Sequence, residues 1–216
     1  MREGDKNFKG WKRMIQIEHL KKKFGDKILF DDFNLTIDDG EFVVLSGDSG
    51  RGKTTLLNMI GAIEPFDAGR ILVDGIDISN KKNQLFYLQQ KVGFLFQNFA
   101  LIDYKTVRQN LQLIKKKSRS ETTLEDALQQ VGLATKVNQK VYSLSGGEQQ
   151  RVALARLMMK QCDIIFADEP TGSLDRKNAE HVMNIIQTLN EQGKTIVLVT
   201  HDEIIKQYAS RVVYLT

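Results

Sequence analysis

Residues 47–54 read Gly-Asp-Ser-Gly-Arg-Gly-Lys-Thr, which matches the phosphate-binding pattern G-x-x-x-x-G-K-[ST]. The glycines let the backbone curl so that successive N–H groups point inward at phosphate oxygens. The helix predicted after them adds the positive end of its dipole. Lys53 is expected to reach the β- and γ-phosphates, and the Thr54 hydroxyl to ligate Mg²⁺. The residues predicted to contact a nucleoside triphosphate are Gly47, Asp48, Ser49, Gly50, Arg51, Gly52, Lys53, Thr54 and Thr55.

A pair of carboxylates follows the apolar run Ile164–Ala167. A buried parallel strand that ends in two acids places them at the carboxyl edge of the sheet, beside the phosphate-binding loop. Because successive strand residues point to opposite sides, the two acids can take different roles. Asp168 is predicted to hold Mg²⁺ through water, and Glu169 to polarise the attacking water as a general base.

The stretch Leu144–Arg151, called the signature below, reads Leu-Ser-Gly-Gly-Glu-Gln-Gln-Arg. A Ser hydroxyl and two glycine N–H groups at the start of a helix form a second anion-binding N-terminus. One nucleotide cannot easily use two complete phosphate cradles of the same subunit. A two-fold dimer resolves this, because each subunit can offer its signature to the γ-phosphate held by the other.

These motifs and their order resemble those of the ATP-binding subunits of ABC transporters, from about Ile15 to the C-terminus. The resemblance implies an ATPase that uses ATP and Mg²⁺, pairs with a second copy of itself and serves an integral-membrane permease. ATP binding is implied to close a head-to-tail dimer, and hydrolysis to reopen it. Since both halves of the site are intact in this one chain, we expect a homodimer.

The resemblance also gives roles to residues that are weak signals alone. It implies that Gln97 approaches Mg²⁺ and the attacking water, that His201 clamps the γ-phosphate and that Asp175 organises the dimer contact. The implied catalytic set is Lys53, Gln97, Glu169 and His201. The implied metal set is Thr54, Gln97 and Asp168. The signature residues that act in trans are Ser145, Gly146, Gly147 and Glu148.

The sequence departs from the family pattern at two places. Phe24 stands where an aromatic residue, often Tyr, stacks on adenine in that family. A phenyl face can still stack, but packing into the core is an open alternative for Phe24. Arg51 and Thr54 stand where Ser is more usual. Thr54 keeps the hydroxyl that can ligate Mg²⁺. Arg51 adds a positive charge near the phosphates, and the sequence alone gives no direction for its effect on nucleotide binding.

Three sequence segments resemble those of one branch of the family, the lipoprotein-release and macrolide-export branch, which includes ATPases for bacteriocin export. They are Val92–Phe99, Leu144–Arg151 and Asp168–Asp175, together with Leu56–Gly61. We therefore expect export of an antimicrobial peptide, a lipoprotein or a drug. The cargo itself is not encoded, because an ATP-binding subunit touches nucleotide and permease.

The elements that must position these residues follow from periodicity. Apolar runs at Phe42–Leu45, Ile164–Ala167 and Ile196–Val199 are typical of central parallel strands, and alternating runs before residue 40 are typical of antiparallel ones. Helical patterns lie at about 53–63, 107–117, 124–131, 147–160 and 178–191. The expected fold is α/β: a P-loop NTPase core with a mainly parallel sheet, an antiparallel edge sub-domain and a helical insert at about 98–160. Residues 1–13 are expected to be a loose extension, and 14–216 one domain.

Composition limits where the protein acts. No apolar run approaches the about 20 residues that span a bilayer, no signal peptide is evident, and the single cysteine is typical of a reducing compartment. We expect a cytoplasmic protein that lies on the inner face of the cell membrane through its permease. The net charge of the chain is +4, and its distribution is uneven. Residues 81–119 carry nine Lys/Arg, and Asp103 is the acidic residue among them. Without aromatic interleaving or a nucleic-acid motif, we expect no nucleic-acid partner.

Two other functions stay open at this point. A non-transport ABC ATPase, which regulates a cell-envelope enzyme or scaffolds an assembly, would carry the same motifs. A metabolic P-loop kinase would share residues 47–54 but does not predict the signature. A kinase would consume ATP only with its acceptor substrate.

Overall fold

The computed structural model describes residues 13–215; the predicted loose extension, apart from Arg13, lies outside them. The strands are β1 (Arg13–Phe24), β2 (Lys27–Asp38), β3 (Phe42–Ser46), β4 (Ala68–Val73), β5 (Ile76–Asp77), β6 (Val92–Leu95), β7 (Ile164–Asp168), β8 (Thr195–Val199) and β9 (Arg211–Tyr214). The α-helices are α1 (Lys53–Ile60), α2 (Lys81–Gln90), α3 (Val107–Leu111), α4 (Leu124–Gln130), α5 (Gly146–Met158), α6 (Arg176–Glu191) and α7 (Glu203–Lys206). Short 3₁₀ turns are η1 (Lys116–Ser118), η2 (Ala134–Lys136) and η3 (Val141–Ser143).

A five-stranded sheet runs through the middle of the molecule in the order β6-β7-β8-β3-β9, with every neighbouring pair parallel. All five residues of β3 and of β8 are buried, as their uninterrupted apolar sequence predicts. The register pairs Asp168 with Val199 and Leu45 with Val199. Three chain segments therefore leave the sheet together at its carboxyl edge, which is where ligands bind in open α/β sheets.

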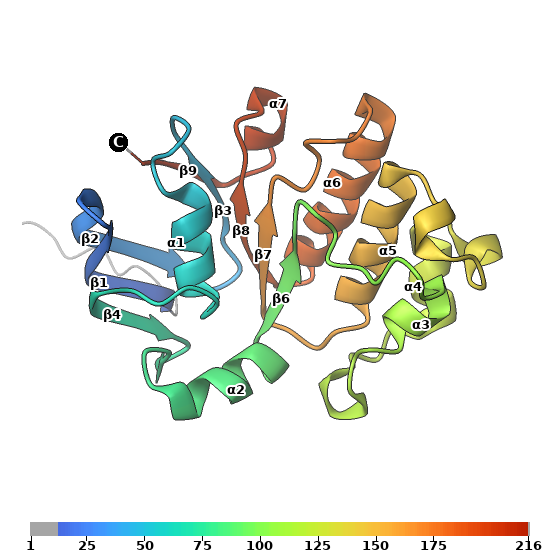
Figure 1. Ribbon diagram of the computed structural model, residues 1–216, viewed down its shortest axis with the longest axis horizontal. Coiled ribbons are helices and arrows are strands. Elements are labelled where there is room, and N and C mark those ends of the chain that lie inside the picture. The colour runs from blue at the N-terminus through green and yellow to red at the C-terminus, as the bar shows by residue number, and fades with distance from the viewer. Residues whose placement is uncertain (1–12, 216) are drawn as a thin grey trace, which may run out of the picture.

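An antiparallel sheet in the order β2-β1-β4-β5 forms the edge sub-domain. Helix α1 lies between this sheet and the parallel one (Figure 1). Its buried side chains Leu56, Leu57, Met59 and Ile60 share a core with β1 and with β3, β7 and β8. This packing fixes α1 directly behind the phosphate-binding loop.

The helical insert packs on the other face of the parallel sheet (Figure 1). Apolar side chains of α3, α4, α5 and α6 form a second core cluster with Leu95, Ala167 and Leu198 of the sheet. The α/β architecture with a parallel sheet, an antiparallel edge and helices is thus confirmed. Within residues 13–215, no helix is long and apolar enough to cross a membrane.

Three details differ from the sequence-based expectation. The runs near residues 28–30 and 35–37 form one strand, β2, which passes through Asp32 in a left-handed conformation (φ 63°). The helix expected at 107–117 ends at Leu111, and the chain continues into η1. Helix α2 was not expected, because it buries only Tyr87 and so lacks an apolar stripe.

Candidate functional site

The phosphate-binding loop connects the end of β3 at Ser46 to the start of α1 at Lys53. Gly47 has φ 135° and passes so close to the residue after β9 that a Cβ atom would lie 2.4 Å from the Leu215 carbonyl oxygen. Gly52 has φ 88°, and a Cβ there would lie 2.6 Å from the side chain of Leu29. Glycine is required at both positions for backbone conformation and for space.

Lys53 and Thr54 occupy the first turn of α1. The Lys53 Nζ donates to the carbonyl oxygens of Gly47 and Asp48, at 2.8 and 2.9 Å. The Thr54 hydroxyl donates to Asp168 Oδ1 at 3.1 Å. The loop and the end of β7 are therefore joined by a direct contact, as predicted from their positions at one sheet edge.

The oxygen donors here are of the kind that Mg²⁺ prefers. Burial raises the pKa of Asp168, and the Thr54 hydrogen bond and the Lys53 charge oppose this rise. Asp168 lines a pocket of about 460 Å³ with Phe96, Gln97 and Asn98. In the described part of the chain, no group of three or more His, Cys, Asp or Glu side chains forms a metal cage. One carboxylate, one hydroxyl and one amide fit Mg²⁺, which keeps several waters and also binds substrate phosphates.

Glu169 follows Asp168 in a left-handed conformation, with φ 45°. Its backbone N–H donates to the Val199 carbonyl at 3.0 Å, which holds it against the end of β8. Its Oε1 lies 2.8 Å from His201 Nδ1, and its Oε2 accepts from the Thr200 hydroxyl at 3.3 Å. The structure thus brings Glu169 and His201 into contact. Sequence reasoning missed Thr200, whose only signal is its place before His201.

The Gln97 segment is connected to the signature helix. Beyond Gln97, Phe99 and Ala100 both have positive φ, at 62° and 48°. Their carbonyl oxygens accept from the guanidinium of Arg156 on α5, and burial lowers the pKa of that group. These hydrogen bonds tie α5 to the turn that follows Gln97.

Helix α5 begins within the signature with a capping box. The Ser145 Oγ accepts from the Glu148 N–H at 3.3 Å, and Glu148 Oε2 accepts from the Ser145 N–H at 3.0 Å. Lys136 lies 2.6 Å from Glu148 Oε1 and, with the Ser145 N–H, lowers the pKa of this carboxyl. Gly146 and Gly147 form the first turn. In the described chain, no hydrogen bond or ion pair links residues 145–148 to residues 47–55.

The signature helix contacts the segment that contains Asp175. Asn178 bonds to Arg151 of α5 on one side and to Asp175 on the other. Asp175 caps α6 by accepting from the Asn178 N–H at 3.0 Å, and these hydrogen bonds lower its pKa. The buried Gln150 donates to the Pro170 carbonyl at 2.6 Å. The signature is therefore tied to the loop between β7 and α6.

Phe24 is not part of the core, which answers the question left open by the sequence. It is 50% exposed and lines a pocket of about 310 Å³ with residues of the phosphate-binding loop, including Gly50, Lys53 and Thr55. Lys27, which carries no motif signal, lines the same pocket and donates to the Gly50 carbonyl at 3.2 Å. Arg51 is exposed at the tip of the loop.

The chain is similar to known proteins in both sequence and structure. The sequence profile of a family described as ABC transporter matches residues 30–172. The macrolide export ATP-binding/permease protein MacB of Campylobacter jejuni is 38% identical over 207 residues, which cover 93% of this chain and 32% of that protein. The chain thus spans about a third of the length of this MacB protein. The uncharacterized ABC transporter ATP-binding protein MJ1508 of Methanocaldococcus jannaschii is 38% identical over 213 residues, 94% of this chain and 95% of that one.

A solved structure is similar over most of its length. The ATP-binding cassette MJ0796, in a dimeric post-hydrolysis state bound to ADP and Pi, superposes with a TM-score of 0.82 at 35% identity and covers 94% of each chain. The family profile and these similarities, together with the intact loop, acid pair and signature, lead to one conclusion. The chain belongs to the ABC transporter family and is an ATPase cassette of that family.

Proposed function

We propose that this cassette powers an exporter, as the nucleotide-binding subunit that works with an integral-membrane permease. The observation that carries the proposal is the division of the site. Thr54, Asp168, Glu169 and His201 lie at one sheet edge, whereas residues 145–148 of the signature make no hydrogen bond or ion pair to residues 47–55 in the described part of the chain. A second copy that presents its signature to this edge would complete the site.

In this proposal, the phosphate-binding loop and Lys53 hold the phosphates of ATP. Glu169 accepts a proton from a water that attacks the γ-phosphorus. The bond between the γ-phosphorus and the bridging oxygen breaks, and ADP leaves with that oxygen. His201, which contacts Glu169, would bind the γ-phosphate from the same side. Thr54, Asp168 and Gln97 would hold Mg²⁺, which would supply positive charge next to the phosphates. The roles of Asp175 and of Ser145, Gly146, Gly147 and Glu148 belong to the contact with the second copy.

The closed dimer is expected to form because each γ-phosphate is shared between Lys53 of one subunit and the signature of the other. Phosphate release removes this shared ligand, and the dimer opens. A few kcal/mol of differential binding between the two states is enough to drive a two-state permease. Support comes from the similarity to a cassette solved as a dimer with ADP and Pi.

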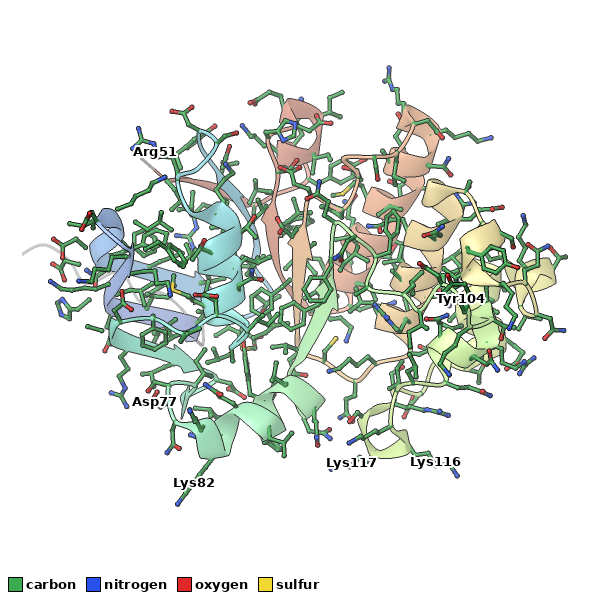
Figure 2. The ribbon with its side chains drawn as sticks, viewed as in Figure 1. Arg51, Asp77, Lys82, Tyr104, Lys116 and Lys117 are labelled. Carbon is green, nitrogen blue, oxygen red and sulfur yellow. The ribbon has the colours of Figure 1, made fainter. Side chains whose placement is uncertain are left out.

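Export is supported by the similarity to macrolide export proteins, whose names include a permease. We infer cargo of the same kind as in that branch: a drug, a lipoprotein or an antimicrobial peptide. The permease would hold the cassette at the inner face of the membrane. The basic segment of residues 81–119 is a candidate contact, because Lys82, Lys116 and Lys117 project from the same edge of the molecule, away from Arg51 (Figure 2). Exposed Leu85, Phe86 and Leu113 lie in the same segments of the chain.

The proposal is tested by capture of tagged Glu169→Gln protein, with ATP and Mg²⁺, from detergent-solubilised membranes of the source cells. We expect a polytopic permease in the eluate, identified by mass spectrometry. A variant with Lys116 changed to Glu should recover less of it, whereas the matched single change of Lys23 to Glu, outside residues 81–119, should not. Soluble partners alone, with the protein absent from membranes, would instead indicate a non-transport ABC ATPase.

A further inference from the structure

We infer that Lys22 is a positioning residue for the nucleobase, because it fixes the ring of Phe24 at the mouth of the phosphate-binding pocket. The inference rests on the proposed ATP site and adds a residue to it. Its ligand class is a planar heterocyclic base attached to a polyphosphate. The argument starts from two side chains of β1 that differ sharply in exposure.

The Phe24 ring is half exposed, so the core does not hold it. Two residues earlier on the same strand, the Lys22 side chain is only 6% exposed, and its Nζ lies 4.5 Å from the centroid of the Phe24 ring. That Nζ also donates to Glu64 Oε1 and to the Pro65 carbonyl, both at 2.7 Å. The ammonium is therefore fixed by two acceptors in the loop between α1 and β4.

A buried ammonium requires partners, and these partners fix its place. An ammonium held near an aromatic ring attracts the ring through its quadrupole, and more strongly where water is excluded. The Lys22–Glu64 pair thus anchors one side of the ring. The exposed remainder of the ring borders the pocket that Gly50, Lys53 and Thr55 also line. A ring fixed before a base arrives loses less side-chain entropy on binding.

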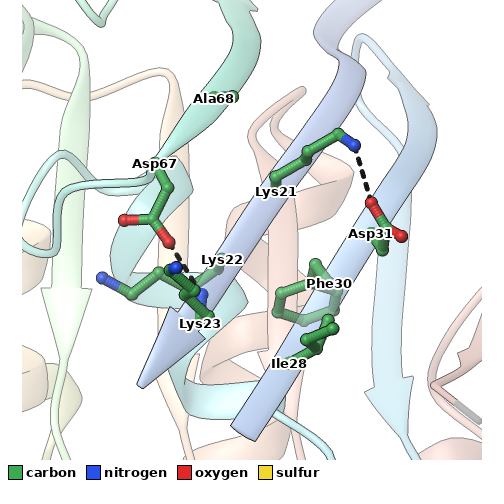
Figure 3. Close-up of a pocket in the computed structure, with 8 residues that line it drawn as sticks. All are labelled: Lys21, Lys22, Lys23, Ile28, Phe30, Asp31, Asp67 and Ala68. Carbon is green, nitrogen blue, oxygen red and sulfur yellow. Dashed lines mark hydrogen bonds and ion pairs between the residues drawn. The ribbon is translucent and has the colours of Figure 1, made fainter. Parts of the chain in front are cut away.

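Lys21 provides a matched control on the same strand. Its Nζ pairs with Asp31 of β2 at 2.8 Å, and about half of its side chain is exposed. Figure 3 shows Lys21 turned toward Asp31 beside a cavity of about 260 Å³ on this hairpin. Replacing Lys21 removes one lysine from the strand without removing the contact to Phe24.

The experiment measures the dissociation constants of ADP and of inorganic triphosphate by calorimetry on the purified chain with Mg²⁺. The variants are Lys22→Met, Lys22→Arg, Lys21→Met, Phe24→Ala, the Lys22→Met/Phe24→Ala double variant and Lys53→Ala. Circular dichroism melting checks that each variant is folded. We expect Lys22→Met to weaken ADP about three- to tenfold, in line with cation–π and ordering contributions. Triphosphate, which has no base, should bind Lys22→Met as it binds wild type.

The other variants make the outcome decisive. Lys22→Arg should restore most of the ADP affinity, Lys21→Met should match wild type, and the double variant should be no weaker than Phe24→Ala. Unchanged ADP affinity in Lys22→Met, or equal losses for ADP and triphosphate, overturns the inference. If Lys22→Met does not fold, Lys22→Gln is measured in its place, and unchanged ADP affinity or equal losses for ADP and triphosphate in that variant overturn the inference. Wild-type binding of both ligands by Lys53→Ala would instead overturn the proposed nucleotide site.

Discussion

Single residues in this site are held by contacts that orient them. Glu169 is the clearest case, because its left-handed backbone, the Val199 carbonyl, Thr200 and His201 together fix the direction of its carboxylate. Similarly, the Thr54 hydroxyl meets Asp168 directly. The motifs identify these residues, and the neighbouring side chains determine where their oxygen atoms point.

The first prediction concerns Lys53. Substitution by Ala removes the cation whose Nζ bonds to the Gly47 and Asp48 carbonyls at the centre of the loop. Since charge-assisted contacts to phosphate are among the strongest hydrogen bonds, ATP affinity should fall by at least about tenfold. Equilibrium binding of a fluorescent ATP analogue measures this. Arg51→Ala, at an exposed position of the same loop, is the control and should lose less affinity.

The second prediction concerns Thr200. Thr200→Val removes the hydroxyl that donates to Glu169 Oε2 and leaves a side chain of similar volume in a buried position. We expect ATP turnover to fall about ten- to a hundredfold, because the change removes a hydrogen bond to the charged carboxylate of Glu169 and also the acceptor of the Asp202 N–H. The dissociation constant for ATP should stay within about twofold. Thr200→Ser keeps the hydroxyl and should turn over near the wild-type rate; equal losses in Val and Ser variants would show that packing is responsible.

Secondary-structure elements are coupled through α5. Arg156 bonds to the turn after Gln97, Arg151 to Asn178, and Gln150 to Pro170. The helix that begins in the signature therefore contacts both the Gln97 segment and the loop after Glu169. The partner of each of these side chains could not be predicted from the sequence motifs.

The third prediction concerns the start of α5 at acid pH. The folded pKa of Glu148 is lowered, first by the hydrogen bond from Lys136 and then by that from the Ser145 N–H. A group with a lowered folded pKa stabilises the fold above its unfolded pKa, and this stabilisation is lost as pH falls through the folded pKa. From about pH 6 to about pH 3, wild type should therefore lose more free energy of unfolding than Glu148→Gln.

Urea denaturation at several pH values measures this difference. Gln can still complete the capping box, so the variant isolates the charge. Glu125→Gln is the control, because Glu125 is exposed and pairs with Arg108 only at 3.6 Å. If the pH profile of Glu148→Gln coincides with that of wild type, Lys136 and Ser145 do not lower the carboxyl's pKa enough to affect stability.

At the scale of the whole molecule, the two halves of the proposed ATP site lie on different parts of one subunit. The fourth prediction follows from this division. Glu169→Gln should bind ATP, hydrolyse it at least about 100-fold more slowly, and elute from gel filtration as a dimer in ATP and Mg²⁺. With ADP it should elute as a monomer. Ser145→Ala in the same background weakens the second half and should shift the elution back toward monomer; a monomeric Glu169→Gln in ATP contradicts the head-to-tail arrangement.

The sequence by itself determined the parts that depend on local pattern. Glycine and lysine spacing in 47–54, the acids after Ile164–Ala167 and three uninterrupted apolar runs were enough to predict the phosphate-binding loop, its neighbouring carboxylates and the parallel sheet. The weakly amphipathic α2 and the early end of α3 were not predictable, because tertiary contacts rather than periodicity fix them.

Only the tertiary structure decided which residues meet. Phe24 is exposed beside the loop rather than packed in the core, Glu169 contacts both His201 and Thr200, and Lys22 reaches Phe24 and Glu64. These pairs come from elements far apart in the chain, or from a side chain's choice between core and pocket. Which side chains meet, and whether a side chain is buried, depends on the register of the sheet and on the packing of the core. The spacing of residues along one strand predicts neither.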